Sequence, residues 1–120
     1  MLHAAAFNKK IVRVVLIEPY SSYRSIVMNR FYNSSLVSGT VAGALKSYDL
    51  PDLAASLAPR KLLVIGSTGA GTITFEKENI TGDLSPISAS YKLMKAENQL
   101  SIIPEKPLGQ LTELFMDWIK

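Results

Sequence analysis

Three short runs of aliphatic residues place the strongest constraint on the fold of this chain. They occupy residues 11–17 (IVRVVLI), 61–65 (KLLVI) and 100–103 (LSII). Aliphatic runs without polar alternation are typical of strands that are buried on both faces of a parallel sheet. The segments between them favour helices, and helix–strand alternation predicts an α/β fold. We therefore expect residues 1–120 to form a single three-layer domain, with a small parallel sheet of about three strands and flanking helices.

The expected helices carry start signals or apolar residues at helical spacing. Asp49 is suited to an N-cap, Pro51 to the first turn, and Asp52 to the positive end of the helix dipole. Pro86 and Pro107 are expected to begin two later helices. Residues 1–8 have the composition of the last turns of a helix whose beginning is missing. The predicted helical segments are residues 1–8, 21–32, 49–58, 86–97 and 107–119.

Composition excludes several classes of partner and site. The chain has a net charge of +3 and its lysines and arginines are scattered, so we expect no nucleic-acid partner. No apolar run reaches the ~20 residues of a membrane helix, so we expect no membrane partner. The N-terminus lacks the layout of a signal peptide, which leaves the compartment open. The absence of cysteine excludes disulfides, thiolate nucleophiles and thiolate metal ligands.

Two adjacent stretches carry a resemblance to a known family. They are residues 44–55 (ALKSYDLPDLAA) and 57–65 (LAPRKLLVI). Together they resemble the segment that leads into the penultimate strand of α/β-hydrolases of the acetyl xylan esterase-like and dienelactone hydrolase-like branch. Residues 2–6 (LHAAA) resemble the end of the helix behind the nucleophile of that family. The resemblance implies that residues 11–17, 61–65 and 100–103 correspond to the last three strands of the family sheet, and that the nucleophile-bearing half is not in this chain.

The chemistry of a serine esterase is not evident in these residues. A nucleophile elbow needs the pattern G-x-S-x-G, but residues 39–43 (GTVAG) carry Val41 at the nucleophile position. Glu18 directly follows a predicted strand and is the one candidate for a catalytic acid, although a solvated or capping carboxylate is the simpler interpretation. The sole histidine, His3, lies in the first predicted helix, and residues 103–110 contain no histidine. We expect this carboxyl ester hydrolase-like chain to be inactive alone, as a fragment or degenerate member of the family.

A glycine-rich loop supports a weaker alternative. Residues 66–71 (GSTGAG) follow a predicted strand, as phosphate-binding loops do, with Gly66, Gly69 and Gly71 as candidate contacts. No Lys-Ser/Thr pair follows the last glycine, and residues 72–75 favour extended structure. We expect no cofactor, and keep a Rossmann-like nucleotide binder as an alternative. With one histidine and no cysteine we also expect no metal site.

Association is the main alternative to a hydrolytic role. The strand at residues 11–17 is expected to lie at an open sheet edge, where it pairs either with another copy of the chain or with the missing N-terminal half. A non-catalytic oligomerising interaction module is consistent with the 48% hydrophobic composition. The apolar helix face formed by Leu111, Phe115 and Trp118 is a second candidate contact. Residues 33–35 (NSS) and 79–81 (NIT) match the N-glycosylation pattern, which matters only in a secretory context.

Overall fold

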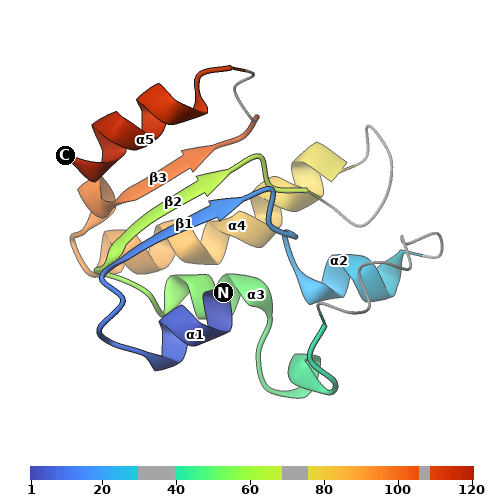
Figure 1. Ribbon diagram of the computed structural model, residues 1–120. Coiled ribbons are helices and arrows are strands. Elements are labelled where there is room, and N and C mark those ends of the chain that lie inside the picture. Colours follow the sequence, from blue (N-terminus) through green and yellow to red (C-terminus); the bar gives the residue numbers. More distant parts are fainter. Residues whose placement is uncertain (30–39, 69–75, 106–108) are drawn as a thin grey trace.

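The computed structural model describes residues 1–29, 40–68, 76–105 and 109–120, and the first four residues of the third range are described by their backbone alone. Helices and strands alternate along these ranges (Figure 1). The elements are, in chain order, α1 (Leu2–Phe7), β1 (Arg13–Ile17), α2 (Tyr23–Met28), the 3-10 turn η2 (Ala44–Lys46), α3 (Leu50–Ala55), β2 (Lys61–Ile65), α4 (Glu76–Leu93), the 3-10 turn η3 (Glu97–Gln99), β3 (Leu100–Ile103) and α5 (Leu111–Ile119).

The strands form a parallel sheet in the order β1-β2-β3. β1 and β2 are paired from Arg13 opposite Lys61 to Ile17 opposite Ile65. β3 pairs with the other edge of β2. Each strand follows its neighbour in the chain, with helices between them, so the sequence-based prediction of a three-stranded α/β fold is confirmed.

Helices cover both faces of this sheet, which gives three layers. α1, α3 and α4 lie on one face, and α5 lies on the other (Figure 1). Alternate strand residues point into the first of these layers, where Val14 of β1 and Leu62 and Val64 of β2 join the buried core. The core also takes in Tyr91 of α4, which is fully buried. The buried residues of this cluster are Ala5, Val14, Ala54, Leu57, Leu62, Val64, Ile87, Tyr91 and Ala96.

The opposite face of the sheet packs against α5. Lys61 donates a hydrogen bond from Nζ to the carbonyl oxygen of Trp118, and its ammonium lies 5.1 Å from the centre of the indole ring. A cation over an aromatic face is attracted by the negative centre of the ring. Leu63 and Ile65, on the same face of β2 as Lys61, are 1% and 0% exposed. Trp118 of α5 therefore contacts this face of the sheet at the amino end of β2.

The start of α3 follows the sequence-based prediction. Asp49 caps α3, and Asp52 accepts the backbone N–H of Asp49 at 2.8 Å, which completes a capping box.

Arg60, just before β2, donates from Nη1 to the carbonyl oxygens of Ala5 at 2.7 Å and Ile11 at 3.0 Å. The guanidinium thereby ties the end of α1 and the segment before β1 to the start of β2.

The predicted start of the fourth helix is wrong. α4 begins at Glu76, ten residues before Pro86, which lies inside the helix. A proline has no N–H to donate to the carbonyl four residues earlier, here that of Gly82. The hydroxyl of Ser85 donates to this Gly82 carbonyl at 2.8 Å, so the acceptor is satisfied and the helix continues through the proline.

Other boundaries differ less from prediction or fall outside the described ranges. α2 ends at Met28, and the last helix begins at Leu111 with Gln110 as its N-cap. Three predicted features lie outside the described residues: the helix start at Pro107, the extended segment 72–75, and residues 30–32 of the second predicted helix. Residues 40–43 precede η2 without forming a helix or strand.

Candidate functional site: the outer edge of β1

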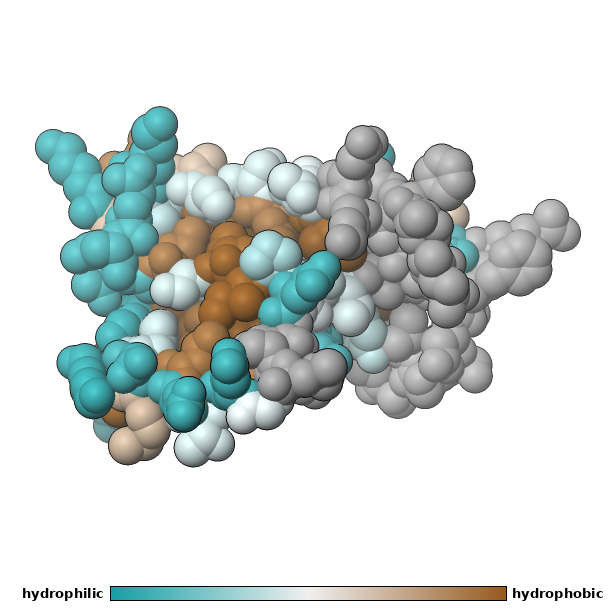
Figure 2. Space-filling model, turned by 90° about the horizontal axis from the view of Figure 1, so that it is seen from above, coloured by the Kyte–Doolittle hydropathy of each residue, from teal (hydrophilic) through white to brown (hydrophobic). Residues whose placement is uncertain are grey.

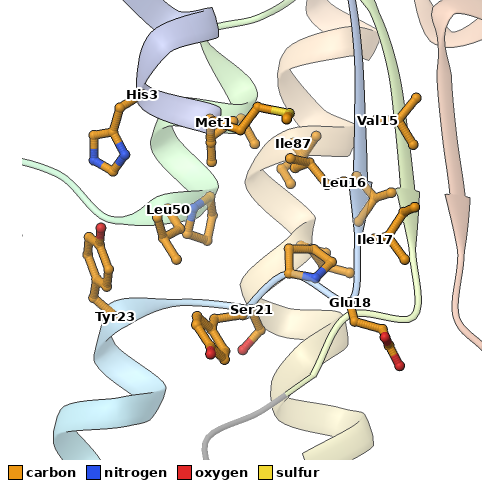
Figure 3. Close-up of a pocket in the computed structure, with 17 residues that line it drawn as sticks. Met1, His3, Val15, Leu16, Ile17, Glu18, Ser21, Tyr23, Leu50 and Ile87 are labelled. Carbon is orange, nitrogen blue, oxygen red and sulfur yellow. The ribbon is translucent and has the colours of Figure 1, made fainter. Parts of the chain in front are cut away.

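Glu18, the candidate acid, lies at the carboxyl end of β1. Its backbone is left-handed, with φ of 49°, and its N–H donates to the carbonyl of Ile65 at 2.7 Å. A left-handed conformation is uncommon outside glycine and turns the chain away from the strand direction. The side chain of Glu18 is exposed and points away from His3 (Figure 3). The structure therefore does not bring the candidate acid and the single histidine together.

His3 is instead part of a small aromatic cluster. Its Nε2 lies 3.2 Å from the hydroxyl of Tyr48, and the two rings meet edge to face with centroids 5.8 Å apart. The hydroxyl of Tyr23 points toward His3 (Figure 3). Burial raises the pKa of Tyr23, against a lowering by a backbone hydrogen bond from Val41, and the charges of Tyr48 and Asp49 raise it further. His3 thus connects α1 to Tyr23 of α2 and to Tyr48, which lies just before α3.

The glycine loop is described only in part. Gly66 directly follows β2 with φ of 60°, and its N–H donates to the carbonyl of Ile103 at 2.8 Å. The left-handed conformation explains why a glycine follows this strand. Gly69 and Gly71 lie outside the described residues, as does the segment that follows them. The nucleotide-binding alternative therefore gains no support from Gly66, whose N–H is used within the sheet.

Two buried serines after β1 were not singled out by the sequence. Ser21 and Ser22 are 3% and 2% exposed, and their hydroxyls donate to the same oxygen, Oδ2 of Asp83, at 2.8 and 2.7 Å. Ser22 also caps α2 by accepting the N–H of Ser25. This arrangement fastens the start of α2 to α4. Since both hydroxyl protons are held by the carboxylate and His3 bonds to Tyr48, the described residues do not form a serine–histidine pair.

A largely apolar cavity of about 510 Å³ runs beside β1 (Figure 3). Leu16 and Ile17 of the strand form one wall, and Met1, Leu50 and Ile87 contribute to the others. It lies where the carboxyl half of β1 faces away from β2. The remaining lining residues are Leu2, His3, Val15, Glu18, Pro19, Tyr20, Ser21, Tyr23, Pro51, Ala54, Val64 and Leu84.

About half of the backbone N–H and C=O groups of β1 face β2. The carbonyl of Val12 accepts from Lys61, and the N–H of Glu18 donates to Ile65, so both point toward β2. Backbone groups alternate sides along a strand, which points those of Arg13, Val15 and Ile17 to the other edge. Among the described residues β1 pairs with β2 alone. The outer edge of β1 therefore presents a row of backbone donors and acceptors beside an apolar cavity.

Exposed apolar side chains accompany this edge. Ile17 is 44% exposed and Val12, just before the strand, is 63% exposed. On the side of the molecule that carries α5, hydrophobic surface is visible between hydrophilic margins (Figure 2). Exposed apolar surface next to an unpaired strand edge is the usual setting of an interaction site.

The described residues define an α/β protein with a three-stranded parallel sheet, and the comparisons assign no closer class. Searches against protein-family models, curated proteins and solved structures found no match to this chain. Within the described ranges, no three His, Asp or Glu side chains gather as metal ligands. In the same ranges no helix has both the length and the hydropathy to cross a membrane.

Proposed function

We propose that this chain corresponds to half of the sheet of a carboxyl ester hydrolase-like α/β protein. We further propose that it works as an assembly module through the outer edge of β1. On its own it does not hydrolyse esters. The observation that carries the proposal is the half-used backbone of β1, which lies next to an apolar cavity and exposed Ile17. A parallel strand of this composition is ordinarily paired on both edges and covered on both faces.

The local structure around the family-like stretch supports the proposed ancestry. Residues 44–55 lead through the Asp49–Asp52 capping box into α3, and residues 57–65 lead into the central strand β2. Arg60 of the Ala-Pro-Arg stretch joins three parts of the chain by donating to main-chain carbonyls. A structural role of this kind accounts for an arginine where the resemblance places it.

The positions of the candidate catalytic residues support the non-hydrolytic half of the proposal. Glu18 and His3 lie apart across the cavity, and the hydroxyls of Ser21 and Ser22 both bond to Asp83. Nucleophilic catalysis by serine needs a base within hydrogen-bond reach of the hydroxyl. Among the described residues the ring of His3 bonds to the hydroxyl of Tyr48, while the hydroxyls of Ser21 and Ser22 bond to Asp83.

A serine-directed probe tests the proposed absence of activity. The folded chain is incubated with a fluorophosphonate probe and, separately, with p-nitrophenyl acetate, beside an active serine esterase and the heat-denatured chain. We expect no labelling of the folded chain above that of the denatured chain, and ester turnover equal to buffer. Stoichiometric labelling of one serine, together with turnover that Ser22→Ala or Ser21→Ala abolishes, would refute the proposal.

A further inference from the structure

The edge of β1 is self-complementary in charge. The strand and its flank run Arg13, four aliphatic residues and Glu18, so a positive charge precedes the aliphatic stretch and a negative charge follows it. Antiparallel pairing of two such strands brings Arg13 of each copy next to the end that bears Glu18 of the other. Parallel pairing places like charges together. Opposite charges across neighbouring strands are favourable and like charges are not.

We propose that the partner on this edge is a second copy of the chain, bound antiparallel across a two-fold axis at Val15. This inference rests on the proposed function and names its partner. The backbone groups of Arg13, Val15 and Ile17 face outward, so Val15 meets Val15 of the second copy, and Arg13 meets Ile17. Each of these opposed pairs exchanges two hydrogen bonds. A closed two-fold contact uses the same patch on both copies, which a self-complementary strand provides.

The side chains fit this register on both faces of the extended sheet. On the face of α1, α3 and α4, Val14 of one copy opposes Leu16 of the other, which already lines the cavity. On the face of α5, Val15 opposes its own copy and the stem of Arg13 lies over Ile17 of the other copy. The contact places β1 in the middle of a continuous sheet and covers Ile17, which is 44% exposed in the single chain.

Single cysteines test the register, because the chain has none of its own. Val15→Cys places its two Cα atoms ~5.5 Å apart across the axis, within the range of a disulfide. The matched control is Val12→Cys, which is three residues earlier in the same segment and 63% exposed. In the proposed register the two copies of residue 12 are offset by six residues, ~20 Å along the strands. Under mild oxidation we expect at least ~10-fold faster dimer cross-linking of Val15→Cys than of Val12→Cys.

Light scattering over a range of protein concentrations tests the interface itself. Val15→Pro removes an N–H that does not take part in the β1–β2 pairing, so the variant should keep its fold by circular dichroism and lose the dimer. Arg13→Glu, which leaves the backbone intact, should raise the dimer dissociation constant by about 10-fold, and Glu18→Arg in the same chain should restore it. This charge reversal keeps the inference testable even where the proline variant does not fold.

The outcomes separate this inference from the proposed function. A dimer that Val15→Pro disrupts, but in which Val12→Cys cross-links as fast as Val15→Cys, rejects the register and leaves an assembly role for the edge of β1. A monomer at every concentration rejects the second copy as partner. A dimer that neither Val15→Pro nor Arg13→Glu weakens rejects both this interface and the proposed use of the edge. Serine labelling by the fluorophosphonate probe rejects the proposed function whatever the oligomeric state.

Discussion

β1 and β2 have nearly the same kind of sequence and very different surroundings. Each has five residues, begins with a basic residue and continues with four aliphatic ones. In β2, the residues from Leu62 to Ile65 are 0–1% exposed, whereas in β1 only Val14 is buried and Ile17 is 44% exposed. The difference comes from position, because in the described part of the chain β2 has a strand on each side and β1 has one. β1 therefore has a sequence suited to a central strand but lies at a sheet edge. This combination indicates that another strand pairs with its outer edge.

The largest expected effect contrasts two leucines that lie on the same face of the sheet, one in the central strand and one in the edge strand. Leu62→Ala removes a fully buried side chain and should lower the free energy of unfolding by about 3 kcal/mol. Leu16→Ala, at the cavity beside β1, should lower it by about 1–2 kcal/mol in dilute solution, because Leu16 is only partly buried there. Urea unfolding at low and high protein concentration provides the measurement. If Leu16→Ala costs as much as Leu62→Ala in the dilute monomer, the contrast between edge and centre is wrong.

A second prediction concerns the residue that joins the two strands at their amino ends. Arg60→Lys should reduce the free energy of unfolding by about 2 kcal/mol, because one ammonium cannot reproduce the guanidinium bonds to Ala5 and Ile11. Arg24→Lys is the matched control, at an exposed position of α2, and should change stability by less than about 0.5 kcal/mol. Equal effects of the two substitutions in urea unfolding would show that Arg60 does not hold the start of β1 against β2.

A smaller effect concerns the pH dependence of the layer beneath β2. Burial raises the pKa of Tyr91 to about 12, against a lowering by the charge of Arg60. The phenol keeps its proton in the folded chain while the unfolded chain ionises near pH ~10. The contribution of Tyr91 to stability is therefore complete below pH ~10 and is lost as the pH rises toward about 12. The difference in melting temperature between the wild type and Tyr91→Phe should shrink or change sign over that interval.

Tyr91→Phe also has an expected effect at neutral pH. The hydroxyl of Tyr91 donates to the carbonyl of Arg60 at 2.5 Å, so its removal leaves a partly buried acceptor without this donor. The expected loss in the free energy of unfolding is about 1 kcal/mol. A variant as stable as the wild type at pH 7, with an unchanged pH profile above pH ~10, would contradict this account of Tyr91.

The parts of the fold that were predictable from sequence are those governed by local patterns. All three strands and the α3 start follow from aliphatic runs and from the Asp49–Asp52 signals, which act over a few residues. The start of α4 was missed because Pro86 looked like a first-turn residue, and the compensating bond from Ser85 to Gly82 is a feature of the folded helix. Local patterns do not report which helix carbonyls find side-chain donors.

The candidate site was predictable only in outline. The exposed edge at residues 11–17 was expected from the resemblance, and the sheet order places β1 there. The bonds of Ser21 and Ser22 to Asp83 join residues 62 and 61 positions apart, and His3 meets Tyr48 across 45 positions. Contacts at such separations depend on how the elements pack, and no spacing rule in the sequence encodes them.

Amide hydrogen exchange along β1 tests the central claim most directly. The amides of Leu16 and Glu18 face β2 and should exchange slowly at every protein concentration, whereas those of Val15 and Ile17 face the outer edge. If a second copy occupies that edge, the Val15 and Ile17 amides will be protected at high concentration and will exchange rapidly on dilution. Rapid exchange of Val15 and Ile17 at all concentrations, with Leu16 and Glu18 protected throughout, would contradict the claim.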